Sequence, residues 1–313
     1  MKQAVKPGQW LNCRKNEILI ANVVMSIVAL FWGVSFISIK IAVSEIPPVT
    51  MALLRFTMAS LLLWVAMRRL EPDASLARSD IPRMVLGGIF GITLYFYFEN
   101  MGVRLSTAAN ASLIVALVPI ITIGLDVLVF RSRISAVKLC GVFIGIAGSY
   151  LSVTANGELD FNSTNFQGNL LIVGAMLSWA VYTLLNKSLQ GRYSGVVLTT
   201  YQTFFGTLCL IPLSLTEYKD WQPFSLLALC HVVFLAVFCS VICYVLYIYV
   251  LKRLDVAITT LYLNVIPVVG VVSGYLVLGE RVFPSQLVGG LLTLLAILLA
   301  NLEQRKTLAR AAR

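Results

Sequence analysis

The chain has 313 residues, of which 59% are hydrophobic and only 12% are charged, and its mean hydropathy is +0.88. Soluble domains are near half apolar and about a quarter charged, so this composition excludes a soluble globular protein. It predicts an all-α polytopic membrane protein. The formal net charge of +10 does not indicate nucleic-acid binding, because the basic residues lie in short loops and tails, where membrane topology explains them.

A membrane-spanning helix needs about 20 apolar residues, and the chain contains ten such runs with only short connections between them. The predicted spans are 20–42, 48–67, 83–102, 106–130, 134–154, 168–188, 196–215, 225–250, 255–278 and 284–301.

The distribution of Lys and Arg predicts the orientation in the membrane. If the N-terminus is cytoplasmic, 19 of the 24 basic residues lie in cytoplasmic tails and loops, and external loops hold only Arg104, Lys219 and Arg281. Cytoplasmic loops carry an excess of Lys and Arg, so both termini are expected to be cytoplasmic. The tails 1–19 and 302–313 then lie inside, and the linker 155–167 lies outside.

The first and sixth spans repeat one another. The stretch "LFWGVSFISIK" (30–40) aligns with "LSWAVYTLLNK" (177–187) at an offset of 147 residues, which pairs Trp32 with Trp179. Matching Trp and Lys anchors at one spacing indicate an internal repeat rather than chance similarity between apolar segments.

The repeat extends to the fourth and ninth spans. "TAANASLIVALVPI" (107–120) aligns with "DVAITTLYLNVIPV" (255–268) at an offset of 148 residues. Each half has five spans, an odd number, so the second half enters the membrane from the opposite side. The prediction is two inverted five-helix repeats, 20–154 and 168–301, an architecture of secondary transporters that alternate access around a midplane site.

The two five-span halves, the Trp-to-Lys first span, the Pro-containing fourth span and "LGERVFPSQLVGGLLTLLAILLA" (278–300) resemble the EamA domains of the drug/metabolite transporter superfamily. The resemblance covers roughly residues 22–301. "YFYFENMGVRLSTAANASLIVALVPI" (95–120) is similar to a stretch typical of bacterial members. The resemblance implies a ten-helix carrier of the cell inner membrane, often an exporter of amino acids or related small metabolites.

Arg55 lies inside the second predicted span, where burial of its charge costs at least a few kcal/mol unless another group receives it. Two roles remain open: a contact with a substrate carboxylate, or a structural strut of the helix bundle. For its partner we predict Glu99, assisted by Asn110. At the repeat offset Arg55 corresponds to Gln202, so both halves place a long polar side chain there.

Polar and aromatic side chains within spans are expected to face the protein interior or a cavity. For each aromatic residue the sequence favours neither packing nor cavity lining. The candidate cavity residues are Trp32, Arg55, Tyr95, Glu99, Asn100, Asn110, Trp179, Gln202, Tyr244, Tyr247, Tyr262 and Asn264.

The leading hypothesis is a secondary transporter of a small metabolite. The chain lacks the GxxxxGK[ST] phosphate-binding motif, so it is not expected to hydrolyse ATP. A single histidine and scattered carboxylates argue against a lipid-acting enzyme, and nothing resembles the repeated selectivity filter of a channel. We expect no cofactor and no metal site. The expected partners are a small-molecule substrate and the lipid bilayer, with the protein a monomer or homodimer.

Overall fold

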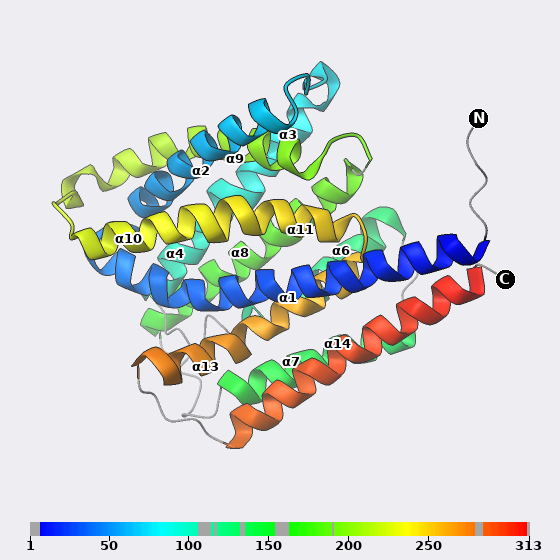
Figure 1. Ribbon diagram of the computed structural model, residues 1–313. Helices are drawn as coiled ribbons and strands as arrows, with labels where there is room; N and C mark the ends of the chain where they lie inside the picture. The colour runs from blue at the N-terminus through cyan, green and yellow to red at the C-terminus, as the bar shows by residue number, and fades with distance from the viewer. Residues whose placement is uncertain are drawn as a thin grey trace.

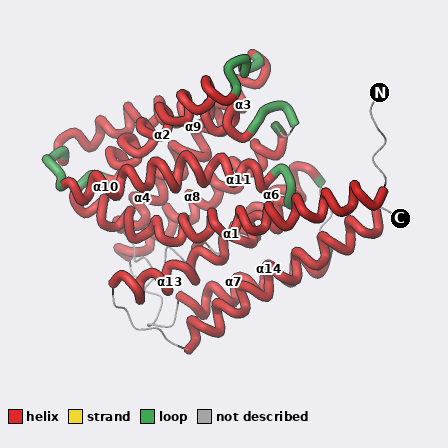
Figure 2. The backbone as a smooth tube through the Cα atoms, viewed as in Figure 1, coloured by secondary structure: helices red, strands yellow, loops and turns green. Residues whose placement is uncertain are grey.

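The computed structural model describes residues 7–105, 114–115, 118–131, 135–153, 163–189, 191–278 and 284–311. Every regular element in these ranges is a helix (Figure 2). The predicted fold class, an all-helical membrane protein built from two inverted repeats, is confirmed.

The first half supplies five spans, the third of which is divided into three helical segments. A short 3-10 turn, η1 (Arg78–Asp80), precedes that third span. The elements are α1 (Pro7–Glu45), α2 (Pro48–Leu70), then α3 (Ile81–Gly88), η2 (Ile89–Leu94) and α4 (Tyr95–Leu105) for the third span, then α6 (Val118–Phe130) and α7 (Ala136–Val153).

The second half follows the same plan, and its eighth span is divided like the third. The elements are α8 (Ser163–Ser188), α9 (Gly195–Ser214) with the turn η4 (Leu215–Asp220), then α10 (Leu226–Phe234), η5 (Leu235–Ile242) and α11 (Cys243–Leu251) for the eighth span, then α12 (Val256–Leu261), η6 (Tyr262–Asn264), α13 (Val265–Leu278) and α14 (Pro284–Ala311).

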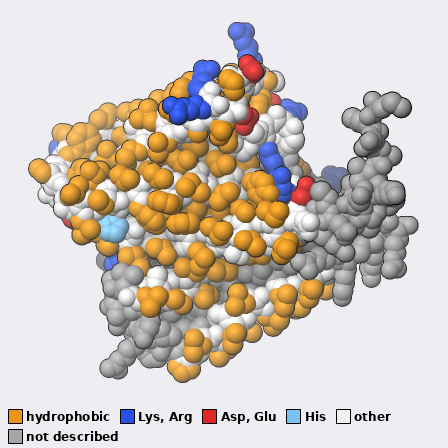
Figure 3. Space-filling view, viewed as in Figure 1, with side chains coloured by type: hydrophobic (Ala, Val, Ile, Leu, Met, Phe, Trp, Pro, Cys, Tyr) orange, Lys and Arg blue, Asp and Glu red, His pale blue; other side chains and the backbone are white. Residues whose placement is uncertain are grey.

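Length and hydropathy support the membrane assignment. Six helical segments are long and apolar enough to cross a bilayer, and within the described residues four shorter apolar helices accompany them. Apolar side chains cover most of the visible face, whereas Lys and Arg gather mainly toward the end where α2 ends and α3 begins (Figure 3). This segregation is typical of a protein whose apolar belt faces lipid.

The helices of the two halves pack in reciprocal pairs. The first span, α1, packs against α13 of the ninth, and the sixth span, α8, packs against α6 of the fourth. Likewise α4 of the third span contacts α8, and α11 of the eighth contacts α1. The start of α1 and the end of α14 lie at the same end of the bundle (Figure 1). An even number of membrane crossings requires that placement.

One helix contact between the halves brings backbones together. A Cβ atom added at Gly88 of α3 would lie 2.5 Å from the carbonyl oxygen of Gln202 and 2.6 Å from the amide nitrogen of Gly206, both on α9. A Cβ at Gly206 would in turn lie 2.6 Å from the carbonyl oxygen of Gly88. Small residues permit such close approach between membrane helices, so α3 and α9 fit together only with glycine at these positions.

The third and eighth spans each contain a π-helical segment, η2 and η5. At the 147-residue offset, Ile89–Leu94 maps onto residues 236–241, inside Leu235–Ile242. The repeat therefore extends to this local distortion. Short π-helical segments are frequent at functional sites, and each is followed within two residues by a tyrosine, Tyr95 or Tyr244, that lines the cavity described below.

Candidate functional site

Trp32 and Trp179, the pair matched by the repeat, meet near the centre of the bundle. Their ring centroids are 5.3 Å apart and their planes are nearly perpendicular, at 89°. Tyr244 packs against both rings, with centroids 5.9 Å from Trp32 and 5.8 Å from Trp179. Perpendicular aromatic contacts of this kind are favourable. The cluster joins α1 to α8 and α11.

A cavity lies beside this aromatic cluster, and the space between its walls, counted together with the part that is open to solvent, is about 510 Å³. Its walls are mostly apolar and aromatic with a few polar groups, the composition typical of small-molecule sites. The lining residues are Trp32, Ser35, Phe36, Ile39, Arg55, Tyr95, Phe96, Glu99, Val115, Val118, Met176, Trp179, Tyr244, Leu263 and Ile266.

Arg55 is 2% exposed, and its guanidinium is held from two sides. Its Nε donates a 2.7 Å hydrogen bond to Oγ of Ser240 in η5. The guanidinium carbon lies 4.6 Å from the ring centroid of Phe96 and 5.1 Å from that of Phe56. Cation–π contacts of this kind contribute about 0.5–2 kcal/mol each. The Nη1 atom is buried and has no hydrogen-bond partner among the described residues.

Glu99 is 5% exposed and occupies the cavity wall formed by α4. Its Oε1 accepts a 2.8 Å hydrogen bond from the hydroxyl of Tyr95, one helical turn earlier. Its Oε2 is buried and, within the described part of the chain, accepts no hydrogen bond. Arg55 and Glu99 therefore present unpaired atoms of opposite charge within one cavity.

The predicted direct pair between Arg55 and Glu99 is wrong for this structure. These two described residues form no ion pair, because Ser240 and Phe96 hold the guanidinium while Tyr95 holds the carboxylate. Ser240 comes from the other half of the chain. Asn110, the predicted assistant, lies outside the described residues.

Three further candidates are buried away from the cavity lining and connect helices. Asn100 donates a 3.1 Å hydrogen bond from Nδ2 to the carbonyl of Pro48. Gln202 donates a 3.1 Å hydrogen bond from Nε2 to Oδ1 of Asn186. The hydroxyl of Tyr247 shares a 2.9 Å hydrogen bond with that of Thr183.

Two candidates on the ninth span also lie outside the cavity lining. Tyr262 donates a 2.8 Å hydrogen bond to Oδ1 of Asn22 on α1. Asn264 is fully buried against Gly145 of α7, where an added Cβ would lie 2.5 Å from its Nδ2. Six residues of the predicted set line one cavity in the structure: Trp32, Arg55, Tyr95, Glu99, Trp179 and Tyr244.

Several lining residues were missed by the sequence reasoning, although helical spacing carries a signal for some of them. Ser35, Phe36 and Ile39 follow Trp32 at intervals of three, four and seven residues, so they share its face of α1. Met176 precedes Trp179 by three residues for the same reason. Ser240 had no comparable signal, because only the folded bundle brings η5 against α2.

Along the axis of the bundle, the cavity lies on one side of the tryptophan pair. On α1 its lining residues run from Trp32 toward Glu45, and on α8 they end at Trp179. Beyond Trp179, the described residues Tyr182 and Thr183 of α8 are 1% and 0% exposed, so their side chains are closely packed there. This packed region lies toward the end of the bundle where α1 begins, which the distribution of Lys and Arg predicts to be cytoplasmic.

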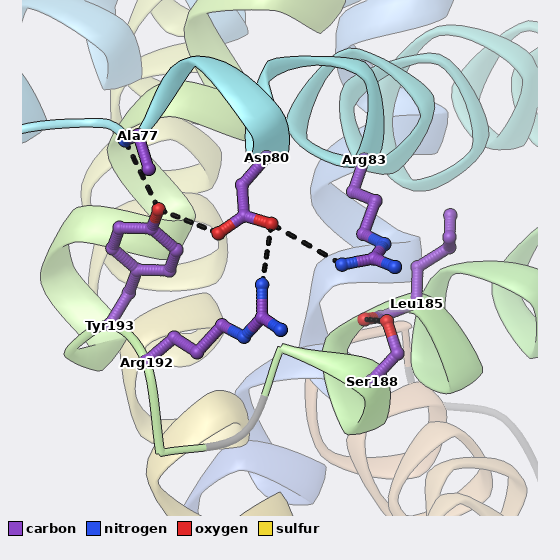
Figure 4. Close-up of polar contacts among 7 residues, drawn as sticks. All are labelled: Ala77, Asp80, Arg83, Leu185, Ser188, Arg192 and Tyr193. Atoms are coloured by element: carbon purple, nitrogen blue, oxygen red, sulfur yellow. Dashed lines mark hydrogen bonds and ion pairs between the residues drawn. The ribbon is translucent and has the colours of Figure 1, made fainter.

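A polar cluster joins the two halves at that same end (Figure 4). Asp80 is 2% exposed. Its Oδ1 accepts hydrogen bonds from Arg192 at 2.7 Å and Arg83 at 3.3 Å, and its Oδ2 accepts a 2.9 Å bond from the hydroxyl of Tyr193. Burial, together with the bond to Asp80, raises the pKa of Tyr193, so this hydroxyl remains a donor at neutral pH. Asp80, Arg192 and Tyr193 are called the Asp80 cluster below.

A second polar contact lies at the same end. Nζ of Lys187, near the end of α8, lies 2.5 Å from Oδ1 of Asp126 on α6. Lys252, which follows α11, donates a hydrogen bond to the carbonyl of Tyr193. The Lys187–Asp126 pair therefore connects the two halves at the end away from the cavity, whereas the bond from Lys252 to Tyr193 lies within the second half.

Comparison with known proteins supports the same architecture. The chain matches the EamA-like transporter family over residues 19–154 and again over 166–302. A solved crystal structure superposes with a TM-score of 0.74 over 90% of this chain and 98% of that chain, at 20% identity, which shows a shared fold.

Two curated relatives align along nearly their whole length. An uncharacterized transporter of Archaeoglobus fulgidus is 30% identical, covering 91% of this chain and 98% of its own. A probable terminal-alkyne amino-acid exporter of Streptantibioticus cattleyicolor is 28% identical, covering 89% and 91%. The matched family consists of transporters and not enzymes. With two family matches that together span most of its length, this chain belongs to the EamA-like transporter family.

Proposed function

We propose that this protein is a secondary transporter that exports an amino acid or a related small metabolite across the cell inner membrane by alternating access. The cavity supports this proposal most directly, because residues of both inverted halves line it and it lies to one side of the tryptophan pair. On the other side of the tryptophan pair, side chains are closely packed and polar contacts join the helices. Alternating access requires such a closed end opposite an accessible site. The similarity to a probable amino-acid exporter supports the substrate class.

Transport by purified protein in liposomes tests the proposal. We expect flux of an amino acid or related metabolite to saturate with concentration and to accelerate when unlabelled substrate is present on the opposite side, because a carrier binds substrate before it changes conformation. Liposomes without protein are the control. Flux that rises linearly with concentration and shows no counterflow would indicate a channel instead.

The proposal includes a topology, with residues 1–19 and 302–313 cytoplasmic and the linker 155–167 external. We expect a single cysteine placed at Asn156, in a chain without its six native cysteines, to react with an impermeant thiol reagent in intact cells. A single cysteine at Asp73, in the connection after α2, is the matched internal control and should react only after permeabilisation. The reverse pattern would refute the orientation.

A further inference from the structure

Two buried polar atoms on cavity-lining residues have no hydrogen-bond partner in the described part of the chain: Nη1 of Arg55 and Oε2 of Glu99. Their residues are 2% and 5% exposed. A buried polar group without a partner costs about 1–3 kcal/mol, and a charged group costs more. A ligand that supplies the missing partners removes this cost when it binds.

The protein prevents the two charged groups from satisfying one another. Ser240 and the ring of Phe96 fix the guanidinium of Arg55, and Tyr95 fixes the carboxylate of Glu99. The two side chains come from different helices, α2 and α4, and each has a buried polar atom without a hydrogen-bond partner among the described residues. The cavity thus offers a cationic donor and an anionic acceptor at separate places on its wall.

From this arrangement we infer that the cavity binds a small zwitterion, with its carboxylate at Nη1 of Arg55 and its ammonium group at Oε2 of Glu99. The inference rests on the proposed function for its biological context and names the chemistry of the transported molecule. A ligand with only one charge leaves the other buried group without a counter-charge, which is strongly unfavourable.

The remaining wall agrees with this ligand class. Aromatic faces such as those of Tyr95 and Trp179 attract an ammonium group. Ile39, Val118 and Leu263 supply an apolar surface for the rest of the molecule. A compact amino acid with an apolar side chain fits these features.

The repeat supplies no second copy of this charge arrangement. At the offsets of 147 and 148 residues, Arg55 and Glu99 correspond to Gln202 and Tyr247, both neutral. Those two side chains bond to Asn186 and Thr183 and do not line the described cavity. The inference therefore assigns one oriented zwitterion site per chain.

Equilibrium binding to the purified full-length protein in lipid nanodiscs tests the inference. The probes are leucine, valine, methionine and phenylalanine, each compared with its amide, which keeps only the cation, and with its desamino acid, which keeps only the carboxylate. We expect at least one amino acid to bind about 10- to 100-fold more tightly than both of its single-charge analogues, the range for one lost hydrogen bond to a charged group.

Variants then assign the two ends of the ligand. Glu99→Gln should remove most of the preference over the desamino acid, and Arg55→Gln most of the preference over the amide. Asp73→Asn and Arg68→Gln, exposed positions outside the cavity, should retain both preferences. If the variants at Arg55 and Glu99 fail to fold, the comparison of ligands on the unmodified protein still decides the matter.

The outcomes separate the inference from the proposed function. Selective binding of an amino acid without flux in liposomes would support the zwitterion site and contradict the transport proposal. Saturable flux of another metabolite, with no preference for amino acids over their single-charge analogues, would support transport and overturn the zwitterion site. Absence of binding by all four amino acids would overturn it as well.

Discussion

Gly88→Ala is expected to destabilise the protein by about 3 kcal/mol or more, the upper end of the range for overpacking. The added Cβ would lie 2.5 Å from the backbone oxygen of Gln202 and 2.6 Å from the backbone nitrogen of Gly206. A flexible side chain could move aside, but a helix backbone moves only with the whole of α9. The variant should therefore separate α3 from α9, a contact between the two halves.

Thermal unfolding of purified protein in detergent, together with the yield of monodisperse material, measures this effect. Gly206→Ala should behave alike, because its Cβ would lie 2.6 Å from the carbonyl oxygen of Gly88. Gly124→Ala on α6 is the matched control, since an added Cβ there has no described atom within 4 Å. If Gly88→Ala melts at the same temperature as Gly124→Ala, α3 and α9 do not pack as closely as described.

Hydropathy predicted the ten spans because the bilayer leaves no other way to satisfy backbone hydrogen bonds than continuous helix. It located the apolar part of each helix better than the helix ends. The second span was predicted as 48–67 and the helix is Pro48–Leu70, whereas the sixth was predicted from residue 168 and α8 begins at Ser163. Polar residues continue the helix beyond the apolar segment, and hydropathy carries no information about them.

The divisions of the third and eighth spans had no signal in the sequence pattern. A π-helical turn changes which backbone groups bond while leaving the composition apolar, so η2 and η5 look like ordinary helix in a hydropathy analysis. Both have consequences for the site. The carbonyl of Cys239 in η5 accepts a 3.0 Å bond from the indole of Trp32, and that of Gly91 in η2 accepts a 3.1 Å bond from Tyr244.

The internal repeat was the most informative sequence feature for the site. It matched Trp32 with Trp179, and these two side chains touch in the structure. It could not identify the partner of Arg55, because inverted repeats interlock and place η5 of one half against α2 of the other. Contacts between halves depend on the relative placement of helices, which residue spacing within one half does not contain.

The Asp80 cluster leads to the second large expected effect. Asp80 precedes α3 in the first half, while Arg192 and Tyr193 precede α9 in the second half. Loss of the carboxylate charge should weaken the connection between the two repeats at the end of the bundle where α1 begins. We expect Asp80→Asn to shift the conformational equilibrium toward states open at that end.

A cysteine reporter at Thr183 measures this shift, because that side chain is 0% exposed and lies beside Tyr247 in the packed region beyond the tryptophan pair. In a chain without native cysteines, Asp80→Asn should raise the rate at which Thr183→Cys reacts with an impermeant thiol reagent by at least about 5-fold, the lower end of typical coupling between sites. The reagent should act from the side predicted to be cytoplasmic. Arg78→Gln, exposed and close to Asp80, is the control.

The two arginines that bond to Asp80 distinguish a connection between halves from local stabilisation of a loop. Arg83 is three residues from Asp80 and belongs to the same half, whereas Arg192 reaches it from the other half. Their side chains are similarly accessible, at 46% and 53%, so solvent screens both pairs to a comparable degree. Arg192→Gln should therefore accelerate labelling at Thr183→Cys, and Arg83→Gln should leave it nearly unchanged. Equal acceleration by both variants would mean that Asp80 stabilises its own loop and does not hold the halves together.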